Sequence, residues 1–130
     1  MGNKTEYWLN LCDDDLKAAK AMLESKNFLW MGFICHLIAE KSLKAVIANR
    51  SDETPPKIHD LQTLAKRSGI IANLSEEQLT LLETLNPLQI EARYPEYKQR
   101  ISETLTLEKC QKIFKQTEGF LCWIKQQLDA

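Results

Sequence analysis

One nearly continuous apolar segment, WMGFICHLIAEKSLKAVIA, spans residues 30–48 and constrains the fold more than any other part of the chain. As a helix over about residues 28–49, it is apolar around most of its circumference. A helix that is apolar on all sides is stable only when other elements cover it. The segment therefore predicts a central, buried helix with the rest of the chain packed around it.

Polar residues interrupt this helix along one line. His36, Glu40 and Lys44 recur every four residues, and Lys41 lies next to them. Glu40 precedes Lys44 by four residues, which is the favourable order for an ion pair within a helix. Two interpretations stay open: a solvated or interface-facing strip with an internal salt bridge, and a functional groove along the buried helix.

Two further segments have the three- and four-residue apolar spacing of amphipathic helices, at about residues 5–25 and 106–128. The first contains the acidic run 13–15. Because successive helical residues fan out by about 100°, these three carboxylates do not converge on one ion, and we interpret them as a solvated face. In the second segment, Gly119 weakens the helix by about 1 kcal/mol relative to alanine, which is tolerable where a neighbouring helix packs closely.

Shorter helices are expected between these segments. Two consecutive prolines make residues 50–58 a loop, because proline cannot continue a helix. His59 or Asp60 then opens a short helix, LQTLAKRS, which Gly69 ends.

The sequence S-E-E-Q, from Ser75 to Gln78, has the pattern of a capping box at the start of another helix, and this helix stops before Pro87. No strand pattern is present in the sequence. The chain is therefore predicted to form one domain over residues 1–130, an all-α, up-and-down bundle of four or five helices.

Charge and cysteine usage exclude several classes of protein. Seventeen basic and eighteen acidic residues give a net charge of −1, which argues against a strongly basic nucleic-acid binder. No charge-free apolar run approaches the roughly 20 residues of a membrane span, and the N-terminus lacks the apolar core of a secretory signal. The cysteines have no close pairing and fall at or beside apolar positions, so we expect reduced thiols in a cytoplasmic protein without membrane contact. They are Cys12, Cys35, Cys110 and Cys122.

Common catalytic and cofactor motifs are missing. The sequence has no Gly-rich phosphate loop, no G-x-S-x-G, no H-E-x-x-H and no zinc-type spacing of cysteine and histidine. Of the two histidines, His59 lies just before a predicted helix, where histidine more often caps or packs than catalyses. We therefore predict no catalytic residue, no metal and no cofactor.

The segment EARYPEY, residues 91–97, breaks the helical pattern before the last helix. Arg93 carries a guanidinium group, which is suited to a two-pronged grip on phosphate or carboxylate. Tyr94 and Tyr97 beside it have rings on which a base can stack. The alternative is structural: Arg93 pairs with a neighbouring glutamate while Tyr94 packs over a helix end.

Three motifs follow one another along the chain: FICHLIAEKSLKAVIA in the buried helix, P-x-x-H-D-L-x-x-L at residues 56–64, and A-R-Y-P at residues 92–95. In this order they resemble the HEPN domain, a helical bundle named for nucleotide binding in higher eukaryotes and prokaryotes. The resemblance spans nearly the whole chain. Its signature in the buried helix consists of Ala39, Glu40, Lys41, Lys44 and Ala45.

This resemblance implies an all-α bundle, commonly a homodimer, that in prokaryotes acts beside a minimal nucleotidyltransferase in a toxin–antitoxin-like pair. Other HEPN branches are metal-independent ribonucleases with an arginine followed after four to six residues by a histidine. Here eight residues separate Arg50 from His59, and no histidine follows Arg67, Arg93 or Arg100. Enzyme activity is therefore left open, with the balance toward a protein that binds rather than cleaves.

Three functions follow, in order of preference: a module that binds nucleotide or RNA and pairs with a nucleotidyltransferase, a structural interaction bundle, and a degenerate ribonuclease that uses His59 with Arg50 or Arg93. The hypothesis for the binding site is that Arg93 pairs with Glu40, or shares a phosphate site with Lys41 and Lys44. The full set of candidate binding residues is Glu40, Lys41, Lys44, His59, Arg93, Tyr94 and Tyr97.

Overall fold

A computed structural model describes residues 2–91, 94 and 104–129. Over these ranges the chain is built from helices, and no strand occurs in them. The elements are α1 (Asn3–Glu24), α2 (Phe28–Arg50), α3 (Leu61–Ser68), the 3-10 helix η1 (Ile70–Asn73), α4 (Glu76–Leu85), α5 (Leu88–Glu91) and α7 (Leu107–Asp129). The predicted boundaries of the three long helices agree with these to within two residues.

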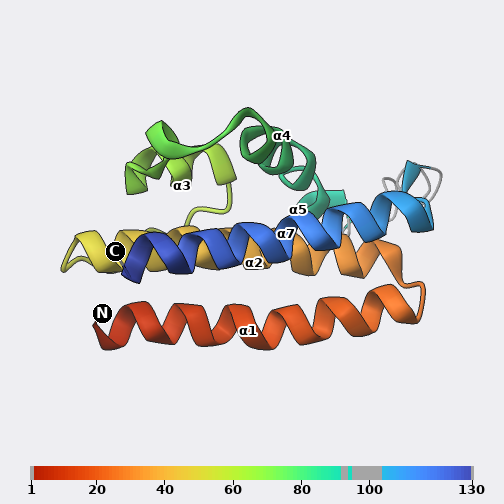
Figure 1. Ribbon diagram of the computed structural model, residues 1–130, viewed down its shortest axis with the longest axis horizontal. Helices are drawn as coiled ribbons and strands as arrows, with labels where there is room; N and C mark the ends of the chain where they lie inside the picture. The colour runs from red at the N-terminus through yellow and green to blue at the C-terminus, as the bar shows by residue number, and fades with distance from the viewer. Residues whose placement is uncertain (1, 92–93, 95–103, 130) are drawn as a thin grey trace.

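Three long helices lie side by side, and short helices cover one of their faces (Figure 1). Helix α2 runs back along α1, and α7 runs in the same direction as α2. The chain between them returns along the bundle through α3, η1, α4 and α5, so these short helices take the place of one long ascending helix. The predicted all-α, up-and-down bundle is confirmed.

Helix α2 is the centre of this arrangement, because it packs against α1, α3, α4, α5 and α7. Met31, Ile38, Leu43 and Val46 are completely buried along its length. Helix α5 comes close to α2 at Gly32, where an added Cβ would lie 2.9 Å from Cδ1 of Leu88. The prediction of a central, buried helix at this position is therefore confirmed.

The predicted helix ends are also found. Ser75 and Gln78 form a complete capping box, with the Gln78 amide donating to Oγ of Ser75 at 3.1 Å and the Ser75 amide donating to Oε1 of Gln78 at 2.9 Å. Asp60, rather than His59, caps the start of α3. Gly69 ends that helix with φ 79°, a left-handed conformation that glycine adopts without steric cost.

Three expectations differ from the structure. The acidic run on α1 is not simply solvated, because Asp13 pairs with Lys125 at 2.6 Å and Asp15 pairs with Lys41 at 2.6 Å. Gly119 has no atom within 4 Å of the position where a Cβ would lie, so no described helix packs closely there. Cys122 is exposed, while the other cysteines are buried as expected.

None of the helices in the described ranges combines the length and the apolar character needed to cross a membrane.

Candidate functional site

Glu40 is the centre of a charged cluster on α2, and only 5% of its surface is exposed. One carboxylate oxygen, Oε2, accepts a bond from Nζ of Lys44 at 3.0 Å. The other, Oε1, lies 2.9 Å from Nδ1 of His59 and 3.8 Å from Nδ1 of His36. Because an ionised carboxylate only accepts hydrogen bonds, the nitrogen of His59 that faces it carries the proton.

Lys44 is buried with Glu40, with 6% of its surface exposed. Its ammonium group also lies 5.7 Å from the centre of the Trp8 ring on α1, a distance at which a cation is attracted to the ring face. A buried ion pair gains little net stability over apolar residues of the same size, but removal of one partner leaves an uncompensated charge. Lys44 is thus positioned as the counter-charge of Glu40.

His59 is the member of the cluster that faces outward, since half of its side chain is exposed. It projects from the turn that leads into α3, and the next residue fixes that turn. Asp60 accepts from the amide of Thr63 at 2.9 Å and from Nδ2 of Asn86 at 2.7 Å. Oδ1 of Asn86 in turn accepts from the amide of Leu61 at 3.0 Å. The turn is thus tied to the end of α4, and His59 is held on its surface.

These bonds also change the acidity of Asp60. The hydrogen bond from Asn86, followed by those from Thr63, lowers the pKa of the Asp60 carboxyl group below its ordinary value, because each bond stabilises the charged form.

Lys41 does not belong to the cluster, contrary to the predicted polar line. Its ammonium group donates to Asp15 on α1 at 2.6 Å, because neighbouring residues on a helix point about 100° apart. One lysine is bound to Asp15 on α1 and the other is buried against Glu40, so the structure does not bring the two ammonium groups together, and the phosphate site that Arg93 would share with Lys41 and Lys44 stays a prediction.

Arg50 is also used elsewhere. Its Nη1 donates to the carbonyl oxygen of Ser68, at the C-terminal end of α3, where a cation satisfies an otherwise unpaired helix carbonyl. Arg50 thus serves the end of a helix, and the pairing of His59 with Arg50 in the ribonuclease hypothesis has no support in this arrangement.

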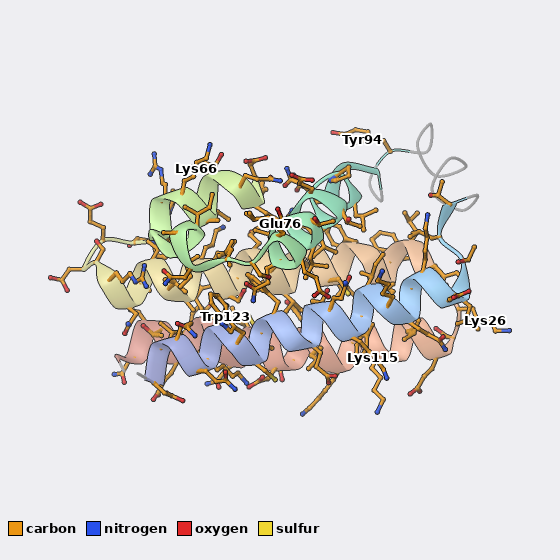
Figure 2. All side chains as sticks on the ribbon, turned by 45° about the horizontal axis from the view of Figure 1, so that its top comes forward. Lys26, Lys66, Glu76, Tyr94, Lys115 and Trp123 are labelled. Atoms are coloured by element: carbon orange, nitrogen blue, oxygen red, sulfur yellow. The ribbon has the colours of Figure 1, made fainter. Side chains whose placement is uncertain are left out.

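Arg93 and Tyr97 lie outside the described residues, so their predicted places at the site remain predictions. Tyr94 is half exposed. Figure 2 places it at the far end of the short-helix layer from Lys66 of α3.

Two residues that complete the cluster were not predicted, Trp8 and Asn86. Trp8 lies within the amphipathic segment predicted at residues 5–25, and nothing in the local sequence places it over a lysine. Asn86 is 26 positions from Asp60, and no local pattern joins them. Among the described residues, no group of three or more histidine, cysteine, aspartate or glutamate side chains is placed to hold a metal ion.

Over the described residues the structure is therefore an all-helical protein in which the buried carboxylate of Glu40 holds the half-exposed ring of His59. The family model of the HEPN domain matches residues 5–127, and the chain belongs to the HEPN domain family.

Among solved structures, the chain is similar to the crystal structure of the protein TT1696 from Thermus thermophilus. The match has a TM-score of 0.81 and 18% sequence identity, and it covers 96% of this chain and 98% of that one. At this identity the similarity shows the fold. No curated protein matches the chain.

Proposed function

We propose that this HEPN protein is a cytoplasmic homodimer that binds the phosphate of a nucleotide or RNA at His59 and acts with a nucleotidyltransferase in a toxin–antitoxin-like pair. The observation that carries the binding site is the 2.9 Å contact between the buried carboxylate of Glu40 and the half-exposed ring of His59. The dimer, the partner and the paired role rest on family membership and on the resemblance of Ala39–Ala45 and Arg93–Pro95 to the HEPN signature.

The chemistry of the pair suits an anionic ligand. Glu40 fixes the Nδ1 proton of His59, so Nε2 is the nitrogen available to a ligand. When the ring is protonated, Nε2 donates a charge-assisted hydrogen bond, and a phosphate oxygen is a strong acceptor for it. Lys44 neutralises Glu40 from the other side, so the buried carboxylate repels an approaching phosphate less.

A small ligand fits the charge of this chain better than a long nucleic acid. Broad affinity for RNA comes mainly from basic side chains that neutralise many phosphates. A chain of net charge −1 has little excess positive charge for this. A nucleotide requires only a few contacts.

Isothermal titration calorimetry with ATP and AMP tests the site. We expect His59→Ala to weaken nucleotide binding by about tenfold or more, the loss of one charge-assisted hydrogen bond. Lys66→Ala, which removes an exposed cation from α3, is the matched control and leaves the affinity unchanged. The site is wrong if the parent protein binds neither nucleotide, or if His59→Ala binds as tightly as the parent.

Arg93→Ala is a separate variant for the predicted guanidinium grip, and it also weakens binding if Arg93 contacts the phosphate. Light scattering tests the homodimer, and co-purification with the product of an adjacent nucleotidyltransferase gene tests the partner.

The geometry of the Glu40 and His59 pair also favours a second candidate function, metal-independent RNA cleavage. A carboxylate that orients a histidine is the arrangement of a general base. In this case the protein cleaves RNA in the presence of a chelator, and His59→Ala abolishes the cleavage. An activity that survives His59→Ala, or that requires added metal, contradicts it.

A further inference from the structure

A straight line of residues on α7 is exposed over its whole length. Its members follow one another at alternating intervals of four and three residues, so they lie on one side of the helix. We call this line the outer seam: Glu108, Lys112, Lys115, Gly119, Cys122, Gln126 and Asp129. Figure 2 shows α7 across the front of the bundle with Lys115 extending away from it. No described part of the chain covers the outer seam.

The middle of the outer seam contains two small residues, Gly119 and Cys122. Glycine weakens the interior of a helix relative to alanine, so its presence there needs a reason. The backbone gives none, because the only positive φ angles among the described residues are at Lys26 and Gly69. Packing within the described chain gives none either, since a Cβ at Gly119 would meet no atom within 4 Å.

We propose that the outer seam is the surface on which two copies of this chain pair, with their α7 helices antiparallel about a twofold axis between Gly119 and Cys122. This inference rests on the homodimer in the proposed function and gives that dimer its surface. In this arrangement Gly119 of one copy faces Cys122 of the other. The same register places Lys115 opposite Gln126, and Lys112 opposite Asp129.

The distribution of charge along α1 and α7 favours a second copy as the partner. Helices α1 and α7 lie side by side and antiparallel, so residues 17–26 accompany residues 107–116 at one end of the molecule. These two segments carry six lysines and two glutamates, whereas residues 3–15 and 117–129, at the other end, carry two lysines and six acidic residues. A twofold axis near the middle of α7 lays the basic half of each copy over the acidic half of the other. Such self-complementarity is what an interface between identical surfaces requires.

Shape supports the same register. Gly119 forms part of the wall of a hollow of about 330 Å³ between α4 and α7, together with Leu81 and Phe120. Because glycine has no side chain, Cys122 of the second copy can approach the backbone and rest at the edge of this hollow. Small residues at a helix crossing allow such a close approach.

Cysteine cross-linking tests the register. In a Cys122→Ser background, Lys115→Cys and Gln126→Cys are made as two separate proteins, and each is treated with copper phenanthroline alone and as a mixture. Residues 115 and 126 face each other in the proposed dimer, whereas two copies of either one lie about 16 Å apart along the helices. We expect a covalent dimer in the mixture and none in either protein alone, with Cys122→Ser as the blank.

A second variant tests the close approach. Gly119→Gln puts a long side chain of good helix propensity on the outer seam, so the helix is retained while the crossing is blocked. We expect circular dichroism to remain helical and the dimer, measured by analytical ultracentrifugation, to weaken by tenfold or more.

The outcomes separate the surface from the proposed function. If the parent is a monomer at all concentrations tested, both the homodimer and this surface are wrong, while the nucleotide site is judged by its own titration. A parent that is a dimer but gives no covalent product in the 115 and 126 mixture, or a Gly119→Gln variant that dimerises as tightly as the parent, overturns the surface and leaves the homodimer intact. Should Gly119→Gln lose its helicity, the cross-linking result decides.

Discussion

Nδ1 of His59 lies 2.9 Å from Oε1 of Glu40, so a residue on the surface is held by a carboxylate in the interior of the bundle. The same carboxylate bonds to Lys44, which is also buried. Changes to Glu40 are therefore expected to affect both stability and the orientation of His59.

Glu40→Gln keeps the size of the side chain and removes its charge. Lys44 is then buried without a counter-charge, and we expect the free energy of unfolding to fall by about 3–5 kcal/mol. Urea denaturation measures this change. Glu24→Gln, at an exposed position on α1, is the control and is expected within about 0.5 kcal/mol of the parent. A loss below about 1 kcal/mol for Glu40→Gln would show that the interior tolerates the unpaired ammonium.

The double variant Glu40→Leu with Lys44→Met replaces the ion pair by apolar side chains of similar size. Because both buried charges are removed together, we expect it to be more stable than Glu40→Leu alone and close to the parent. Denaturation of the two single variants and the double variant provides the comparison. If the double variant is as unstable as the less stable of the two single variants, the polar contacts of this cluster are needed for the fold itself.

Asp60 contributes to the stability of the folded protein in a way that depends on pH. Its pKa is lowered in the folded protein, so the stabilisation is present at neutral pH and is lost as the pH falls below the ordinary value of 3.8. Asp60→Asn keeps an acceptor for the helix cap without a charge. We expect it to cost about 1 kcal/mol at pH 7, and the difference from the parent to shrink on acidification. If thermal unfolding shows the same difference in stability between the parent and Asp60→Asn at pH 7 and at pH 3, this account is contradicted.

A side chain at Gly69 is expected to destabilise the fold. Its φ of 79° is strained for other residues, and a Cβ would lie 3.1 Å from Nη1 of Arg50. Gly69→Ala is therefore predicted to lower the free energy of unfolding by about 1–2 kcal/mol. Gly119→Ala, where a Cβ meets nothing within 4 Å and φ is not positive, is the control and is expected to cause no loss of stability.

Thiol labelling distinguishes the cysteines. Burial raises the pKa of Cys12 and Cys35 to about 12 and that of Cys110 to about 11, so these thiols stay protonated and unreactive. We expect one thiol per chain, Cys122, to react with Ellman's reagent in native buffer, and four in denaturant. If a dimer covers the outer seam, the rate at which Cys122 reacts falls as the protein concentration rises. Rapid labelling of a second thiol in native buffer would contradict the expectation that Cys122 alone reacts.

The long helices and their ends were predictable because their signals are local. Apolar periodicity located α1 and α7, the nearly continuous apolar run located α2, and the S-E-E-Q pattern located the start of α4. The burial of the charged residues on α2 was not predictable in the same way. The four-residue spacing of Glu40 and Lys44 places them on one face of α2 but does not say what covers that face.

The partners that cover this face come from distant parts of the chain. His59 reaches Glu40 from 19 positions away, and Trp8 reaches Lys44 from another helix. Lys41, next to Glu40 in sequence, points instead to α1. Sequence patterns thus identified the members of the cluster on α2 and His59, and missed Trp8 and Asn86, whose places depend on how the helices cross.

The parallel course of α2 and α7 has a kinetic consequence. Helices α1 and α2 are joined by residues 25–27 and can form a hairpin with little loss of chain entropy, whereas residues 51–106 must be ordered or looped out before α7 meets α2. Docking of α7 is thus expected to be the late step of folding. Until then the side of α2 that α7 covers stays exposed, and the chain is most exposed to aggregation in that interval.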